Sequence, residues 1–170
     1  MVRAPSQGPG DRERCRCRLD SHRAARRSLT RFWDSSGIVS LLVRERQTDA
    51  AESLLSDDSR IAAWWATPVE CGSALARLLR DRHLDAEQVH VASRRLHEIS
   101  RQWIEIEPTE SLRDIAQTLA LRHSIRAADA LQLAAAMTYS EGLTSAPEFV
   151  TFDARLGSAA QHEGFRTRGI

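Results

Sequence analysis

From Phe32 onward the chain alternates short apolar runs with longer amphipathic segments. Short apolar runs between helical patterns are typical of buried strands that pair in parallel through helical crossovers. The alternation therefore predicts an α/β fold, a three-layer α/β/α sandwich with a central parallel sheet of four to five short strands. The expected strands are 32–34, 60–65, 103–106 and 149–151, with a further one at 165–167, and the expected helices are 36–45, 49–56, 68–82, 85–102, 109–123, 127–141 and 154–163.

The residues before this pattern differ from it in composition. Residues 1–31 contain nine arginines and three acids, which gives a net charge of +6, and almost no apolar side chains. Because such a segment cannot form a core, we expect residues 1–31 to be a disordered basic extension and residues 32–170 to be the folded domain. The extension is either an arm that contacts nucleic-acid phosphates or an artefact of a start codon chosen too far upstream.

Composition excludes several kinds of chemistry. All 24 basic residues are arginine, so mechanisms that need a lysine, such as P-loop phosphate binding or Schiff-base formation, are excluded. The longest uncharged run, Ala130–Ser140, has 11 residues, and a membrane-spanning helix needs roughly 20. The N-terminus lacks an apolar signal-peptide stretch, and three cysteines do not indicate a disulfide framework. We therefore expect a cytoplasmic protein with no membrane association.

Four acidic residues occupy positions where a surface acid is not expected. Asp34 and Asp153 each follow an expected strand and precede an expected helix, so each is either a helix N-cap or part of a site. Glu70 ends a T-P-V-E sequence that matches a capping box, and the role of cap partner competes with a functional one. Asp129 interrupts a nearly apolar helix, so either an ion pair with Arg126 or a bound cation must compensate its charge.

These four acids are expected to converge at one edge of the sheet, because the carboxyl ends of parallel strands meet there. Closely packed carboxylates repel one another, and a ligand set of oxygens alone suits a hard cation such as Mg²⁺ or Mn²⁺. One or two such ions can activate a water molecule and hold a phosphodiester for in-line attack. This reaction needs neither a lysine nor a nucleophilic side chain, so metal-dependent phosphodiester hydrolysis fits the residues best.

Four stretches of the sequence resemble one known family. They are FWDSSGIVSLL around Asp34, TPVECGSALARLLR around Glu70, RAADALQLAAA around Asp129 and FVTFDARLGSAAQHEGF around Asp153. Together, in this order over residues 32–169, they resemble PIN-domain ribonucleases, specifically VapC-type toxins of bacterial toxin–antitoxin pairs. The resemblance implies a PIN-like α/β/α sandwich, endonucleolytic cleavage of an RNA substrate with Mg²⁺ or Mn²⁺, a homodimer, and inhibition by a cognate antitoxin protein.

The same resemblance implies the site residues. Ser36 and Thr151 match small hydroxyl residues that often line such sites, and Arg126 lies where a basic residue commonly precedes the third acid. The basic extension departs from the family's short forms, whose chains usually begin just before the first aspartate. The residues at the four acidic positions, which the resemblance makes catalytic residues and metal ligands, are Asp34, Glu70, Asp129 and Asp153.

Two other functions are compatible with the same residues. One is a non-catalytic PIN-like module that binds RNA or a partner protein. The other is a metal-dependent phosphatase or DNase that uses the same carboxylates. The sequence leaves open which RNA is cut, because specificity depends on the shape of the groove and on scattered arginines.

Overall fold

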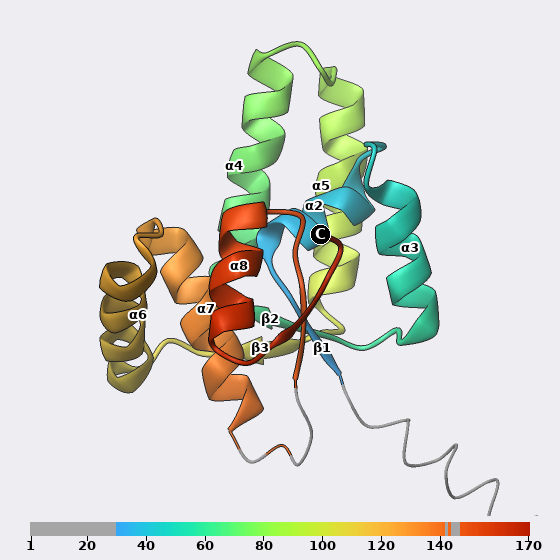
Figure 1. Ribbon diagram of the computed structural model, residues 1–170. Helices are drawn as coiled ribbons and strands as arrows, with labels where there is room; N and C mark the ends of the chain where they lie inside the picture. Colours follow the sequence, from blue (N-terminus) through green and yellow to red (C-terminus); the bar gives the residue numbers. More distant parts are fainter. Residues whose placement is uncertain (1–29, 142, 144–146) are drawn as a thin grey trace, which may run out of the picture.

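Five short strands form one sheet in the part of the chain that the structure describes, which is residues 30–141, 143 and 147–170 of a computed structural model (Figure 1). All four strand pairs are parallel, and the strand order is β3-β2-β1-β4-β5. This confirms the predicted α/β class and parallel sheet. The elements in chain order are β1 (Arg31–Trp33), α2 (Ser35–Leu42), α3 (Thr48–Asp57), β2 (Ile61–Trp64), α4 (Thr67–Arg80), α5 (Ala86–Ser100), β3 (Ile104–Ile106), α6 (Glu110–His123), α7 (Ala127–Ser140), β4 (Glu148–Val150), α8 (Ala154–His162) and β5 (Arg166–Arg168).

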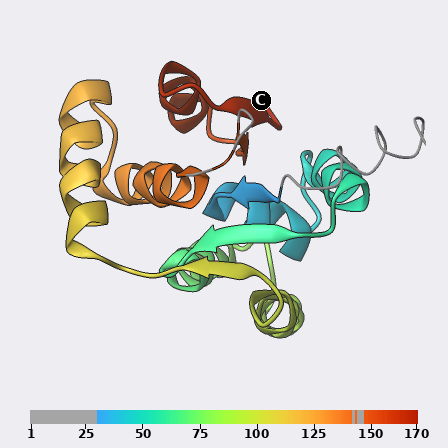
Figure 2. The ribbon, with the colours of Figure 1, turned by 90° about the horizontal axis from the view of Figure 1, so that it is seen from below.

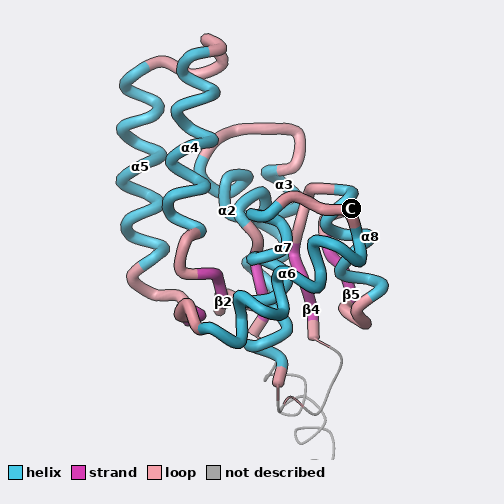
Figure 3. The backbone as a smooth tube through the Cα atoms, turned by 90° about the vertical axis from the view of Figure 1, so that its left-hand side faces the viewer, coloured by secondary structure: helices cyan, strands magenta, loops and turns pink. Residues whose placement is uncertain are grey.

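Helices cover both faces of the sheet, as the alternating pattern predicts. Phe32 of β1 and Phe149 of β4 pack against α6, α7 and α8, whereas Trp33 and Val150 pack against α2 to α5. Figure 2 shows α6, α7 and α8 on one side of the strands and α4 and α5 on the other. The long helices α4 and α5 lie side by side and extend beyond the remaining elements (Figure 3). Within the described residues, no helix is long and apolar enough to cross a membrane.

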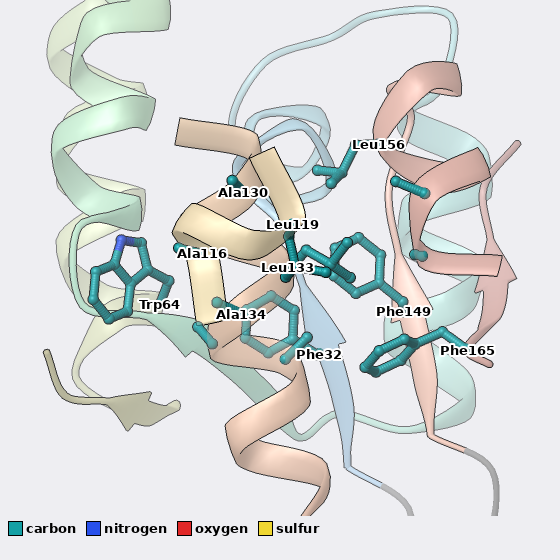
Figure 4. Close-up of a cluster of buried hydrophobic side chains, with 14 of the residues drawn as sticks. Phe32, Trp64, Ala116, Leu119, Ala130, Leu133, Ala134, Phe149, Leu156 and Phe165 are labelled. Atoms are coloured by element: carbon teal, nitrogen blue, oxygen red, sulfur yellow. The ribbon is translucent and has the colours of Figure 1, made fainter. Parts of the chain in front are cut away.

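The core on the α6–α8 face explains why α7 is apolar nearly all round. The rings of Phe32 and Phe149 stack with their centroids 5.4 Å apart, and Phe165 meets Phe149 edge-on (Figure 4). Leu133 and Ala134 of α7 are fully buried against this cluster. Small alanine side chains let α7 lie close to the sheet, so a charged residue on this helix is accommodated only at its end.

The order of the strands places a switch point between β1 and β4. The chain moves outward from β1 through β2 to β3, then returns past both strands to place β4 on the other side of β1. Trp33 pairs with Val150 in this register, and the backbone N–H of Asp34 donates to the Val150 carbonyl at 3.1 Å. Ligand sites of open parallel sheets form at the carboxyl ends of strands beside such a switch point.

A buried carboxylate ties three strands together at the opposite, amino-terminal edge of the sheet. Glu148 accepts hydrogen bonds from Arg31 of β1 at 2.6 Å and from Arg168 of β5 at 2.7 Å. Burial alone raises the pKa of Glu148, but the hydrogen bonds and charges of Arg168 and Arg31 outweigh it and lower the pKa below its usual value. Arg31, which the sequence assigned to the basic extension, is therefore part of the first strand. Thr30, from the same predicted extension, is also described and is buried, whereas residues 1–29 lie outside the described residues.

Gly169, just after β5, packs closely against the segment that follows β4, and this packing can be tested by substitution. Its φ is +102°, and an added Cβ would lie 2.6 Å from the Thr151 carbonyl oxygen and 2.9 Å from the Phe152 ring. Gly169→Ala is therefore expected to lower the free energy of unfolding by about 1–3 kcal/mol, measured by urea denaturation. The matched control is Gly72→Ala in the exposed part of α4, where an added Cβ meets nothing within 4 Å. We expect the free energy of unfolding of this control to rise by about 0.5–1 kcal/mol. A Gly169→Ala protein with an unchanged free energy of unfolding would contradict the described packing.

Candidate functional site

Asp34 is the most buried of the four predicted acids. It directly follows β1, is 2% exposed, and is the N-cap of α2. Its Oδ1 accepts hydrogen bonds from the Gly37 N–H at 2.8 Å and the Ser36 hydroxyl at 2.7 Å, and its Oδ2 accepts one from the Thr151 hydroxyl at 3.0 Å. Because each carboxylate oxygen has two acceptor positions, Oδ1 is saturated, whereas Oδ2 keeps one position to which no described residue donates.

The electrostatic environment of Asp34 disfavours its negative charge. The pKa of Asp34 is raised to about 7, because burial and the weaker effect of the Glu70 charge together outweigh the hydrogen bonds from Gly37, Ser36 and Thr151 that lower it. Near neutral pH a large fraction of this carboxyl group is therefore protonated when no positive charge lies beside it. A cation next to Oδ2 would favour the ionised form.

Ser36 and Thr151 link Asp34 to the segment between β4 and α8. The Ser36 hydroxyl oxygen accepts from the Phe152 N–H at 2.8 Å, and the Thr151 hydroxyl oxygen accepts from the Asp153 N–H at 3.0 Å. Each hydroxyl thus donates to Asp34 and accepts from the segment after β4. The structure therefore places both predicted hydroxyl residues at the site, where they fix the orientation of the Asp34 carboxylate.

The capping-box interpretation of Glu70 is wrong. Helix α4 begins at Thr67 itself, the N-cap residue is Ala66, and no side chain caps this end of the helix. Because the helix starts one residue earlier than the motif implies, Thr67 lies inside the first turn, where its hydroxyl cannot serve as the N-cap. The side chain of Glu70 is thereby available to neighbouring elements.

Glu70 contacts α7 across the sheet edge. Its Oε2 accepts a hydrogen bond from the Gln132 side-chain nitrogen at 3.0 Å. Burial and the charge of Asp129 raise the pKa of Glu70, while hydrogen bonds from Gln132 and Ser35 partly oppose that rise. Glu70 is therefore a half-buried carboxylate that lies near a second acid, away from the solvated surface.

Asp129 lies in the first turn of α7 and forms no ion pair with Arg126 or any other described residue. Burial and the charge of Asp153 raise the pKa of Asp129, and the backbone of Arg126 and the charges of Arg126 and Arg155 lower it only in part. The ion pair proposed as an explanation for this acid is therefore absent, and the compensation that Arg126 provides is incomplete.

Asp153 is exposed and is the N-cap of α8, which is one of the two roles that the sequence leaves open for it. Its Oδ1 accepts from the N–H groups of Arg155 at 2.8 Å and Leu156 at 3.0 Å. Among the described residues nothing donates to its Oδ2. The N-cap interpretation is thus confirmed for both Asp34 and Asp153, and in each case it leaves acceptor capacity on the second oxygen.

Electrostatic repulsion connects the four predicted acids in a series. In addition to burial, the charge of Glu70 raises the pKa of Asp34, and the charge of Asp129 raises the pKa of Glu70. The charge of Asp153 in turn raises the pKa of Asp129. The structure therefore brings these acids, as successive neighbours, to the carboxyl edge of β1, β2 and β4. It does not arrange three of them as a preformed cage, since no group of three or more His, Cys, Asp or Glu side chains in the described part of the chain could hold a metal ion as it stands.

Several residues that support these acids are not among the predicted site residues. Gln132 follows Asp129 by three residues on the same helix face, and a buried amide in an apolar helix is a signal that could have identified it. Arg155 donates to the Ser124 carbonyl at 2.8 Å, a contact that depends on loop geometry and has no signature in the sequence. Cys71 is fully buried, and burial followed by the charges of Glu70 and Asp34 raises the pKa of its thiol to about 12, as expected for a packed and unreactive cysteine.

Solved structures share this architecture. The chain is similar to the protein PAE2754 from Pyrobaculum aerophilum, with a TM-score of 0.58, 19% identity, and coverage of 82% of this chain and 89% of that one. It is also similar to FitAcB from Neisseria gonorrhoeae, with a TM-score of 0.56, 18% identity, and coverage of 81% and 95%. A toxin–antitoxin complex from Klebsiella pneumoniae gives a TM-score of 0.52 at 15% identity, with coverage of 73% and 87%.

Sequence comparison gives the family. A comparison with curated protein sequences finds no significant match. The family model of the PIN domain, however, matches residues 31–161, which is most of the chain and includes all four acids discussed above. The match begins at the first strand of the sheet and ends within α8. This chain therefore belongs to the PIN-domain family.

Proposed function

We propose that this protein is a metal-dependent endoribonuclease and the toxin of a toxin–antitoxin pair. PIN domains are generally nucleases, which supports phosphodiester hydrolysis as the reaction class. The observation that carries the proposal is the series of four acids along the sheet edge, three of which have raised pKa values. A series of acids without a neutralising partner is unfavourable in the isolated chain, and a divalent cation is the ligand that removes the repulsion.

The donors along this edge fit Mg²⁺ or Mn²⁺. They are carboxylate oxygens, the ligands these hard cations prefer, and Asp34 and Asp153 each keep acceptor capacity on Oδ2. In this proposal Asp34 and Asp129 are the principal ligands, and Glu70 and Asp153 complete the ligand shell. When bound, the cation supplies Lewis-acid activation of water and neutralises charge on the phosphate.

The protein side chains perform the remaining steps in this proposal. Glu70, whose carboxyl pKa is raised by burial, is suited to accept the proton of the attacking water. Arg126 is exposed beside Asp129, and its guanidinium is suited to bind the phosphate of the RNA substrate. Ser36 and Thr151 hold Asp34 in one orientation through the hydrogen bonds described above.

The partners and location complete the proposal. The Klebsiella pneumoniae structure that shares this fold is a toxin–antitoxin complex, which supports a cognate antitoxin protein as the regulator of this chain. We further propose that the protein is a homodimer, that it acts in the cytoplasm, and that its substrate is cellular RNA.

A non-catalytic PIN-like module that binds RNA or protein is the second candidate. One observation favours it, namely that the acids in the described residues are not preformed as a three-ligand metal cluster. The two candidates differ in turnover, because a binding module leaves its RNA intact.

The test is cleavage of a mixed RNA substrate by the purified protein. We expect cleavage with Mn²⁺ or Mg²⁺ and none with excess EDTA, because the four acids alone cannot activate water. Asp129→Asn purified in parallel is expected to cut at least about tenfold more slowly, which excludes a contaminating nuclease. Asp114→Asn, which changes an exposed acid of α6, should cut like the parent protein. Binding of RNA without cation-dependent cleavage would favour the non-catalytic module.

A further inference from the structure

Gln132 has a fully buried side-chain amide, and only one of its two polar ends forms hydrogen bonds in the described structure. Its side-chain nitrogen donates to Glu70 Oε2 at 3.0 Å and to the Thr67 hydroxyl at 3.2 Å. Its side-chain oxygen is buried and has no hydrogen-bond partner in the described structure, although the residue is only 1% exposed. A buried carbonyl without a donor is unfavourable, so an apolar side chain of the same shape would suit this position better for stability alone.

The orientation of the amide follows from its neighbours. A carboxylate is an acceptor only, so the nitrogen end must face Glu70. Thr67 and Glu70 both lie in the first turn of α4, and Gln132 lies one turn after Asp129 on α7. The amide therefore connects the helix that carries one acid to the helix that carries the next, at the place where these two acids repel each other.

We propose that Gln132 is a positioning residue that holds the Glu70 carboxylate beside Asp129 for cation binding, and that its buried amide makes the fold less stable. This inference rests on the proposed function. The amide nitrogen supplies a donor that keeps Glu70 turned toward α7, and the unpartnered oxygen is the unfavourable consequence of placing an amide there. Outer residues that orient metal ligands commonly change metal affinity by 10- to 100-fold when they are removed.

The test compares Mn²⁺ binding with stability in the parent and in Gln132→Met, which keeps the length of the side chain. Binding is followed by the loss of the free Mn²⁺ EPR signal, and stability by thermal unfolding in EDTA. We expect Gln132→Met to bind Mn²⁺ about tenfold more weakly and to unfold at the same or a higher temperature than the parent. A lower unfolding temperature with unchanged Mn²⁺ affinity would show a purely structural role and overturn the inference.

Two variants provide matched controls. Thr67→Val removes the other acceptor of the same amide and leaves the bond to Glu70, so Mn²⁺ affinity should stay within about twofold of the parent, well short of the loss expected for removing an orienting partner. Thr138→Val removes a second buried and unpartnered polar atom of α7, the Thr138 hydroxyl oxygen, away from the acids. It should raise the unfolding temperature without changing Mn²⁺ affinity.

Mn²⁺ binding by the parent protein distinguishes failure of the proposed function from failure of the role of Gln132. If the parent fails to bind Mn²⁺, the proposed function and the inference both fall. If the parent binds Mn²⁺ and Gln132→Met binds it equally well, the proposed function stands and the role of Gln132 is refuted.

Discussion

Asp34→Asn is expected to cut RNA about 100- to 1000-fold more slowly than the parent protein, the size of loss seen when one electrostatic group is removed from an active site. It should nevertheless unfold at an equal or higher temperature in EDTA. The side-chain oxygen of asparagine can still accept the hydrogen bond from the Gly37 N–H, and Asn and Asp are similarly good N-caps. It also removes a buried carboxyl group whose ionised form is disfavoured, as its pKa of about 7 shows. Activity and stability are thus expected to change in opposite directions.

Cleavage rates and thermal unfolding of the same preparations check this prediction. The matched control is Asp85→Asn, since Asp85 is also a helix N-cap, accepts from the Gln88 N–H at 2.8 Å, and is exposed at the start of α5. We expect Asp85→Asn to retain full cleavage and nearly unchanged stability. Asp34→Asn protein that is folded and as active as the parent would refute the role of Asp34 in the site.

Without a divalent cation, the parent protein is expected to lose stability between pH 5 and pH 8 relative to Asp34→Asn. The pKa of Asp34 rises from 3.8 in the unfolded chain to about 7 in the folded one, so the folded state holds a proton that the unfolded state has released. The contribution to stability is fully present below about pH 4 and is lost as the pH rises through 7. A shift of this size corresponds to about 4 kcal/mol at most. Burial raises the pKa values of Glu70 and Asp129 as well, so they act in the same direction.

Urea denaturation in EDTA at pH 5 and pH 8 measures this effect as the difference between the parent and Asp34→Asn. Saturating Mn²⁺ at pH 8 is expected to restore the parent, because a ligand that binds only the folded state stabilises it, by about 2.7 kcal/mol at 100 times its Kd. The same addition should stabilise Asp34→Asn far less. Equal pH dependence of the two proteins would mean that the Asp34 carboxylate is not disfavoured by its surroundings.

The strands and the positions of the acids could be predicted because each depends on a short-range pattern plus one topological rule. The apolar runs around Phe32 and Phe149 are local, and parallel pairing follows from the helices between them. Asp34 directly follows β1 and Asp153 lies shortly after β4, so their place at the carboxyl edge required no knowledge of tertiary contacts. The roles of these acids as metal ligands and catalytic residues stay proposals.

The supporting contacts could not be predicted, because they join residues far apart in the chain. The hydrogen bond from Gln132 to Glu70 spans 62 positions, and the motif at Glu70 suggested a local cap instead. Arg155 donates to the Ser124 carbonyl from 31 positions away, and Ser124 has a left-handed backbone conformation, with φ of 51°. Arg31 was assigned to the extension by its charge, whereas its partner Glu148 lies 117 positions away.

The neighbours β1 and β4 also determine when the proposed site can exist during synthesis. Thr151 and Asp34 touch in the folded protein but are separated by 117 positions in the chain. A ribosome that has made the first three strands has therefore produced a chain that still lacks Thr151 and Asp153 of the proposed site, and non-local pairings of this kind form late and slowly. The nascent polypeptide is consequently expected to be harmless to nearby transcripts until residues 148–156 have emerged and docked beside the first strand.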